Sequence, residues 1–151
     1  SLILPDLADD FTKNLYTTWL SYLPESALSY GLDLKTDNRG WLFELFKTKG
    51  SGQIFISKTL PGITRGNHFH HTKTEKFLVL RGEGLIRFRK ITEAGGNLIE
   101  YRVTGNRPEV VDIPPGYTHN ITNVGEGEML TLFWANEIFD PANPDTYYLN
   151  V

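Results

Sequence analysis

The chain has 151 residues, a hydrophobic fraction of 40%, a formal net charge of −3 and no cysteine. This length suits one globular domain, and the lack of cysteine excludes disulfides and cysteine-ligated zinc sites. The charge gives no support to a nucleic-acid-binding face, and no apolar run approaches the roughly 18 residues that span a bilayer. We therefore expect a protein without nucleic-acid or membrane partners, and a cysteine-free chain is compatible with a cytoplasmic location.

The start of the chain has the pattern of a helix. Apolar residues follow helical spacing from Asp6 to Leu23, with Asp6 as the expected N-cap and Pro24 as the stop. The helix could decorate the following domain or be the end of a preceding one. We interpret residues 1–25 as a helical junction and residues 26–151 as the domain itself.

Beyond the helix the pattern changes to short β-rich runs separated by glycine and proline turns. Because no helix-length pattern separates the runs, we predict an all-β sandwich or barrel and not a parallel α/β sheet. Thr146–Val151 is a candidate last strand. The other predicted strands are Trp41–Lys47, Gln53–Lys58, Lys76–Leu80, Leu85–Ile91, Leu98–Val103, Val110–Ile113, Thr118–Asn123 and Met129–Trp134.

The histidines form a candidate metal site. Alternation places His68 and His70 on one face of a strand, with Phe69 on the other. Glu75 begins the next apolar run, and His119 lies on a distant strand. Three histidines and one carboxylate suit zinc, iron, manganese, nickel or cobalt with positions left open for water or substrate. The alternative is an accidental group of histidines in a solvated loop.

The spacing of these residues matches two motifs. The first cupin motif, G-x5-H-x-H-x3,4-E-x6-G, runs from Gly62 to Gly82, and the second, P-x-G-x2-H-x3-N, runs from Pro114 to Asn123. Pro108 replaces the glycine expected six residues before the second motif. The chain therefore resembles the cupin superfamily, which implies a double-stranded β-helix, or jelly-roll barrel, after the N-terminal helix. The resemblance also implies four metal ligands at one mouth of the barrel: His68, His70, Glu75 and His119.

Two further runs resemble nucleotide-sugar 3,5-epimerases that act on 4-keto-6-deoxyhexoses. Asp37–Glu44 is similar to their D-x-R-G-x-F-x-E opening, and Arg65 to His68 is similar to their R-G-x-H run. Carried over, the resemblance makes His68 the general base and Arg65 a phosphate contact. Those epimerases are metal-free and have lysine where Glu75 stands, so the full ligand set of this chain favours His68 as a metal ligand.

A closer resemblance, over nearly the whole chain, is to the C-terminal cupin of bifunctional capsular-polysaccharide enzymes. It is carried by Gly62–Lys73, Glu75–Val79, Ile86–Arg89, Val110–Pro114, Gly116–Ile121, Phe139–Pro141 and Pro144–Tyr147. The family joins an NADPH-dependent short-chain reductase domain to a zinc cupin that inverts C3 of a UDP-linked 4-keto sugar. The resemblance implies Zn²⁺ or another divalent metal, a UDP-sugar substrate and an N-terminal reductase domain in the parent chain. Ser1 as the first residue suits a processed product or an excised piece.

Two expectations concern what this piece binds and how it assembles. The chain lacks the glycine-rich fingerprint of a dinucleotide site, so we expect no nicotinamide cofactor in this fragment. Cupins often pair, so a homodimer is expected by analogy.

Four more residues are candidates for the site. Tyr117 shares a strand face with His119 and is a candidate acid or base, or an ordinary barrel aromatic. His71 is out of phase with the histidines before it and is a catalytic or rim candidate. Arg65 and Arg39 could hold a pyrophosphate because guanidinium is a planar bidentate donor; otherwise they are surface charges.

The expected function is metal-dependent epimerisation at C3 of a UDP-4-keto-6-deoxy-N-acetylhexosamine, in the synthesis of a capsular or surface polysaccharide precursor. The alternatives are a metal-free epimerase with His68 as base, a metal-dependent cupin of another class such as a dioxygenase, and a non-catalytic sugar-nucleotide-binding cupin.

Overall fold

The computed structural model of the chain describes residues 3–92 and 95–151, so the expectation attached to Ser1 lies outside the described residues. The helices are α1 (Asp10–Ser21) and the short 3₁₀ helix η1 (Glu25–Ala27). The strands are β1 (Ile3–Leu4), β2 (Lys35–Asp37), β3 (Gly40–Thr48), β4 (Gly52–Thr59), β5 (Thr64–Phe69), β6 (Glu75–Arg81), β7 (Glu83–Lys90), β8 (Ile99–Thr104), β9 (Val110–Ile113), β10 (Tyr117–Asn123), β11 (Met129–Ala135) and β12 (Tyr147–Tyr148).

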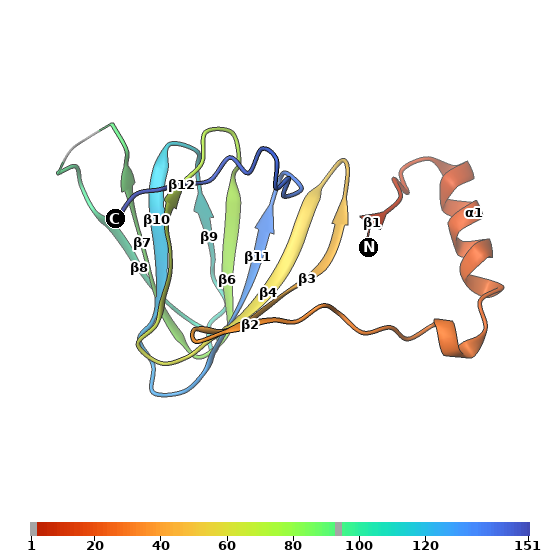
Figure 1. Cartoon of the computed structure of the whole chain (residues 1–151), viewed down its shortest axis with the longest axis horizontal. Coiled ribbons are helices and arrows are strands. Elements are labelled where there is room, and N and C mark those ends of the chain that lie inside the picture. Colours follow the sequence, from red (N-terminus) through yellow and green to blue (C-terminus); the bar gives the residue numbers. More distant parts are fainter. Residues whose placement is uncertain (1–2, 93–94) are drawn as a thin grey trace.

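The strands form two facing sheets (Figure 1). A seven-stranded sheet has the order β1-β3-β4-β11-β6-β9, with β2 also paired to β3, and a five-stranded sheet has the order β12-β5-β10-β7-β8. Every pair is antiparallel except β1 with β3. Strands distant in sequence are neighbours in both sheets, as in a jelly roll, and the predicted all-β barrel is confirmed.

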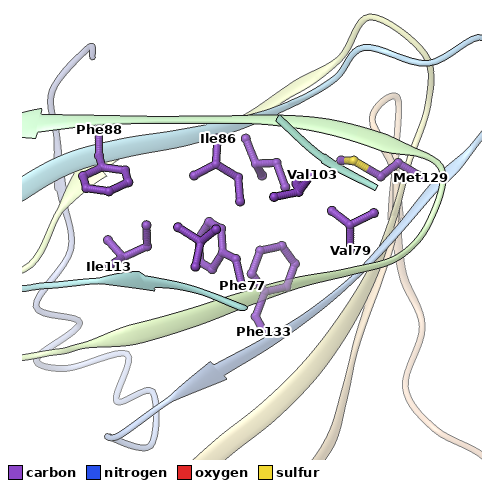
Figure 2. Packing of buried hydrophobic residues seen from close by; sticks show 10 residues of the cluster. Phe77, Val79, Ile86, Phe88, Val103, Ile113, Met129 and Phe133 are labelled. Carbon is purple, nitrogen blue, oxygen red and sulfur yellow. The ribbon is translucent and has the colours of Figure 1, made fainter. Parts of the chain in front are cut away.

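Apolar side chains that alternate inward from both sheets make the core (Figure 2). Phe77 and Phe133 meet edge to face with ring centroids 4.6 Å apart. The cluster consists of Phe77, Val79, Ile86, Phe88, Val103, Val111, Ile113, Ile121, Met129 and Phe133. It fixes the two sheets against each other and so fixes the inward-facing residues beside it.

The N-terminal helix is shorter than predicted. Asp9, and not Asp6, is the N-cap, because its carboxylate accepts the backbone N–H of Thr12 at 2.8 Å. Asp6 instead accepts the N–H of Ala8 in the preceding turn. Figure 1 shows α1 lying apart from the barrel, and Phe11 on this helix is 74% exposed. Since β1 pairs with β3, only part of residues 1–25 is separate from the sheets, and their role as a junction stays a prediction.

The predicted strands agree with the structure to within one or two residues at each end, except for the last one, in which only Tyr147 and Tyr148 pair. The predicted strands omitted β1, β2 and β5, although the alternation of His68 and His70 implied a strand at β5. β1 and β2 are two and three residues long and have no alternating pattern of their own. Among the described residues, no helix is long and apolar enough to cross a membrane.

Candidate metal centre

The four predicted ligands meet at one place between the sheets. His68 lies on β5 and pairs with His119 on β10, while His70 follows β5 directly and Glu75 begins β6 in the opposite sheet. One ligand atom from each residue lies within 4.8 Å of all the others. Bonds of about 2.1 Å would place ligands on opposite sides of an ion about 4.2 Å apart, so one ion can be shared with small adjustments. The structure thus brings together the whole predicted ligand set.

Hydrogen bonds orient two of the imidazoles with an unprotonated nitrogen toward Glu75. The Nδ1 of His70 donates to the backbone carbonyl of Asp145 at 2.5 Å, and the Nδ1 of His119 donates to that of Tyr117 at 3.2 Å. Because a carbonyl only accepts, each Nδ1 must carry the ring proton, which leaves Nε2 with a free lone pair in the neutral ring.

The atoms that face one another between these nitrogens and Glu75 carry lone pairs or negative charge, which suits a cation. The Nε2 atoms of His119 and His70 lie 2.9 Å and 3.3 Å from the Oε2 of Glu75. The Nε2 of His119 is fully buried and has no hydrogen-bond partner among the described residues. Lone pairs that face one another in a buried site repel unless a cation lies between them, so this donor set fits a divalent metal.

The pKa shifts favour the protonation states that a metal needs. Burial, and then the neighbouring His119, lowers the pKa of His68 to about 4, so this ring is neutral at pH 7. Burial acts to raise the pKa of Glu75, but His119 and His70 outweigh it and hold that pKa well below its usual range. His68 therefore offers a neutral imidazole and Glu75 a carboxylate, as coordination requires.

A β-bulge brings Arg65 to the same side as the metal ligands. His119 pairs with His68, whereas the next residue of β10, Asn120, pairs with Gly66, so Asn67 is the extra residue on β5. Regular alternation over three residues would have placed Arg65 and His68 on opposite faces. Because Asn67 is an extra residue, Arg65 and His68 lie on the same face of β5, and both side chains point between the sheets.

Glycine is required in this bulge. Gly66 has φ of +102°, and a Cβ there would lie 2.7 Å from the carbonyl oxygen of His119 and 2.9 Å from the Cα of Asn120. Asn67 follows with φ of +60°, and its side-chain oxygen accepts a hydrogen bond from Asn120 at 2.8 Å. The structure thus explains the R-G-x-H run. Gly66 lets β5 approach β10 closely, and Asn67, the x of the run, is the bulged residue.

The two arginines differ in how they are paired. Arg65 crosses to the other sheet and donates to the Oγ1 of Thr59 at 3.0 Å and the carbonyl of Lys58 at 3.2 Å, which uses only part of its five donors. No carboxylate of the described residues lies within 4.0 Å of it. Arg39 donates twice to Asp37, and these bonds lower the pKa of Asp37 to about 2. Arg65 is therefore the half-buried guanidinium whose charge lacks a partner.

The two catalytic candidates lie in different surroundings. The ring of Tyr117 packs against the core and meets Phe88 edge to face at 5.8 Å. The ring of His71 contacts Phe69 and Tyr147, at 5.3 and 4.9 Å, and is not part of the metal cluster. The catalytic roles of Tyr117 and His71 stay predictions.

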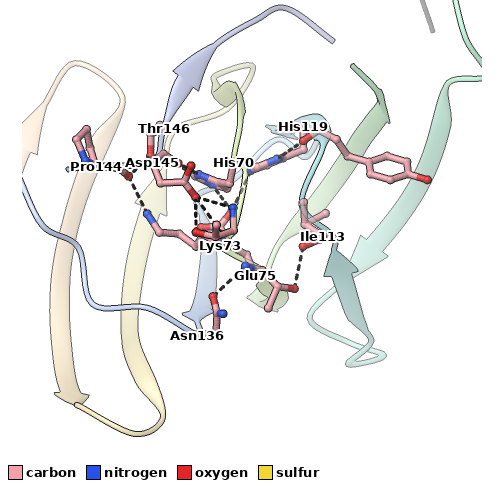
Figure 3. A network of polar contacts seen from close by, with 12 residues as sticks. His70, Lys73, Glu75, Ile113, His119, Asn136, Pro144, Asp145 and Thr146 are labelled. Atoms are coloured by element: carbon pink, nitrogen blue, oxygen red, sulfur yellow. Dashed lines mark hydrogen bonds and ion pairs between the residues drawn. The ribbon is translucent and has the colours of Figure 1, made fainter. Parts of the chain in front are cut away.

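Sequence reasoning missed Asp145, which binds the loop that carries two of the ligands. Its carboxylate accepts the backbone N–H groups of His71, Thr72 and Lys73 at 2.9 to 3.0 Å (Figure 3). Its φ of +41° is rare for a residue with a side chain. The Pro-Asp pair after a polar stretch indicates a turn, but nothing in the sequence indicates which loop that turn would contact.

The rolled pair of sheets, with three histidines and one glutamate between them, defines a cupin that has a candidate metal centre. Residues 35–147 match the polysaccharide biosynthesis C-terminal domain family, and the chain belongs to that family.

The chain is similar to a UDP-sugar reductase and to a capsular polysaccharide assembling protein. The chain is 45% identical over its full length to a UDP-2-acetamido-2,6-beta-L-arabino-hexul-4-ose reductase of Pseudomonas aeruginosa, of which it covers 40%. The crystal structure of the capsular polysaccharide assembling protein CapF from Staphylococcus aureus superposes on 99% of the chain with a TM-score of 0.92 and 53% identity, and the chain covers 40% of that protein. The chain thus spans about two fifths of the length of these relatives.

More distant structures share the fold alone. An oxalate oxidase aligns over 95% of the chain with a TM-score of 0.59 and 23% identity. A dTDP-6-deoxy-D-glucose-3,5-epimerase of Legionella pneumophila aligns over 74% with a TM-score of 0.54 and 18% identity.

Proposed function

We propose that this chain is the metal-dependent epimerase domain of a sugar-nucleotide-modifying enzyme and that it inverts C3 of a UDP-linked 4-keto-6-deoxy-N-acetylhexosamine. The observation that carries the proposal is the group of His68, His70, Glu75 and His119 with the unpaired Arg65 on the same inner face. The relatives support it, because one is named for a 4-keto UDP-sugar and another for capsular polysaccharide assembly.

The proposed chemistry is proton exchange beside a ketone. The C3 proton of a 4-keto sugar is acidic because its loss gives an enolate. A divalent ion, which we propose is zinc, would supply Lewis acidity to the oxygen that gains charge. Tyr117 is proposed to move a proton at C3 through its phenol, since its side chain lies on the same strand face as His119. His71 is the second candidate for this role.

Arg65 is proposed to hold a substrate phosphate. Arg65 and His68 are three residues apart, so their Cα atoms are separated by at most about 10 Å, which is on the scale of a hexose joined to a phosphate. A half-buried guanidinium without a carboxylate partner favours a bound anion. Arg39 is a weaker candidate, because a phosphate would have to compete with Asp37 for its N–H groups.

The proposal also covers the parent chain and its oligomeric state. Because the relatives are longer, we propose that the parent chain carries a short-chain reductase domain and that reduction takes place there. A homodimer is proposed by analogy with other cupins.

The test is deuterium uptake at C3. The 151-residue chain, loaded with Zn²⁺, is incubated in heavy water with the UDP-4-keto-6-deoxy-N-acetylhexosamine, and C3 is followed by NMR. We expect deuterium at C3 without NADPH, and no reduced sugar when NADPH is added. Chelation should slow uptake and added Zn²⁺ should restore it, with each tenfold loss equal to about 1.4 kcal/mol of lost transition-state stabilisation.

Variants separate the roles of the residues. His70→Ala should lose stoichiometric metal and uptake together, whereas Tyr117→Phe should keep the metal and lose about 100-fold or more in rate. His71→Ala is the matched histidine control for metal content, which it should leave unchanged. Uptake at full rate in metal-free protein would favour the metal-free mechanism with His68 as base. No uptake with metal and sugar both bound would favour a binding module.

A further inference from the structure

The segment Pro144–Thr146 lies against the metal centre without supplying a ligand. The Asp145 carbonyl accepts the Nδ1–H of His70 at 2.5 Å, and the hydroxyl of Thr146 lies 3.4 Å from the same nitrogen while it donates to Pro144. Figure 3 shows these groups gathered on the side of His70 that faces away from Glu75. A neutral imidazole whose Nδ1 carries the proton can coordinate only through Nε2.

The same segment holds the loop between His70 and Glu75. All four residues of this loop have their backbone N–H groups bonded by side chains: those of His71, Thr72 and Lys73 by Asp145, and that of Thr74 by Asn136 at 2.9 Å. The buried Lys73 also donates to the carbonyl of Pro144 at 3.0 Å. The contacts run both ways, so the loop and the segment fix each other.

Backbone strain marks the same place. Among the described residues, Asn67 and Asp145 are the two non-glycine residues with positive φ. Asn67 precedes the ligand His68, and Asp145 binds the ligand His70. Such a conformation costs of order 1–3 kcal/mol and persists where its surroundings determine it. At Asp145 the surroundings are the three N–H groups that its carboxylate binds. These bonds outweigh partial burial and hold the pKa of Asp145 well below its usual range.

We propose that Asp145 is a positioning residue for the metal centre: its carboxylate locks the His70–Glu75 loop, and its strained backbone aims the carbonyl that fixes the tautomer and direction of His70. This inference rests on the metal binding of the proposed function and names the element that prepares the site for it.

The test uses three variants of the full chain. Asp145→Ala removes the carboxylate and disfavours positive φ, so the carbonyl should leave His70. Asp145→Asn keeps one acceptor oxygen and tolerates positive φ, so it should rescue the Nδ1–H tautomer of His70 and part of the metal affinity. Asp140→Ala is the matched control, because within residues 3–92 and 95–151 the Asp140 side chain bonds only Ala142 and Asn143, in its own turn.

Two measurements read the result. In metal-free protein, the ¹⁵N NMR pattern of the His70 ring should show a proton on Nδ1 in the wild type, in Asp145→Asn and in Asp140→Ala, and a mixture of tautomers in Asp145→Ala. In chelator competition, Asp145→Ala should bind Zn²⁺ about 10- to 100-fold more weakly than wild type, with a changed visible spectrum of the Co²⁺ form.

The inference is overturned if Asp145→Ala keeps the Nδ1–H tautomer and binds Zn²⁺ within twofold of wild type. It is also overturned if Asp140→Ala loses as much affinity, since the effect would then belong to general folding of the segment. Absence of metal binding in the wild type would refute the proposed metal chemistry, and the tautomer in metal-free protein would still decide the role of Asp145.

Discussion

Replacing Gly66 by alanine tests how the bulge of β5 joins the phosphate and metal positions. The new Cβ would lie 2.7 Å from the carbonyl oxygen of His119 and 2.9 Å from the Cα of Asn120, both of them backbone atoms that no rotamer change can move. The φ of +102° adds strain of roughly 1–2 kcal/mol for a residue with a side chain. Overpacking in a fixed environment adds about 1–3 kcal/mol, so we expect a loss of about 3 kcal/mol.

Substitutions at two other glycines distinguish the cost of backbone strain from the cost of overpacking. Gly116 has φ of +77° with open space around its missing Cβ, so Gly116→Ala should cost only the strain, about 1 kcal/mol. Gly50 also has open space, and its φ lies outside the positive region, so Gly50→Ala should be neutral or stabilising by up to about 1 kcal/mol.

The assays are thermal unfolding and metal affinity. At about 2–4 °C per kcal/mol for a chain of this size, Gly66→Ala should lower the Tm by roughly 10 °C and Gly116→Ala by roughly 3 °C. Gly66→Ala should also weaken metal binding about tenfold or more, because β5 must move away from β10 and take His68 away from His119. A Gly66→Ala protein with wild-type Tm and metal affinity would refute the assignment of the bulge.

Three further predictions concern other parts of the site and its support. Arg65→Ala should weaken UDP-sugar binding about tenfold or more in calorimetry while metal content stays at wild type, and unchanged affinity would remove Arg65 from the site. Because His68 titrates near pH 4 when folded and near 6.5 when unfolded, metal-free protein should lose up to about 3 kcal/mol of stability as the pH falls from 6.5 to 4; a flat denaturation midpoint over this range would contradict that shift. Asn123→Ala should cost about 3 kcal/mol or more, read by urea denaturation, because the fully buried side chain bonds the backbone of Thr59, Gly125 and Gly127, and a cost below 1 kcal/mol would show that water replaces these bonds.

The sequence was most informative where a local pattern determines the structure. Strand positions followed from alternation and turn residues, and the ligand set followed from the two spaced motifs. His68 and His70 share a face and stand with Glu75 and His119, as predicted. Asn123, the last residue of the second motif, bonds the 123–127 turn through its amide.

The features that were missed depend on pairing between distant segments. Counting alternation from His68 gives the wrong face for Arg65, because an extra residue in a strand is visible only in its register with a partner. The role of Asp145 depends on a contact 75 residues away from His70, through a backbone carbonyl that any residue type possesses. The helix N-cap was placed at Asp6 because Asp6, Asp9 and Asp10 all suit that position on composition alone.

The placement of the ligands on both sheets has a consequence for folding. His68 and His119 belong to the five-stranded sheet, and Glu75 belongs to the seven-stranded sheet. An ion held by all of them would tie the layers together beside the apolar core, and it would bind only the folded chain. A ligand present at 100 times its Kd adds about 2.7 kcal/mol to the stability of a protein that binds it only when folded. The amount of folded protein in a metal-poor cell would then depend on metal supply, so scarcity would lower the abundance of the domain as well as its activity.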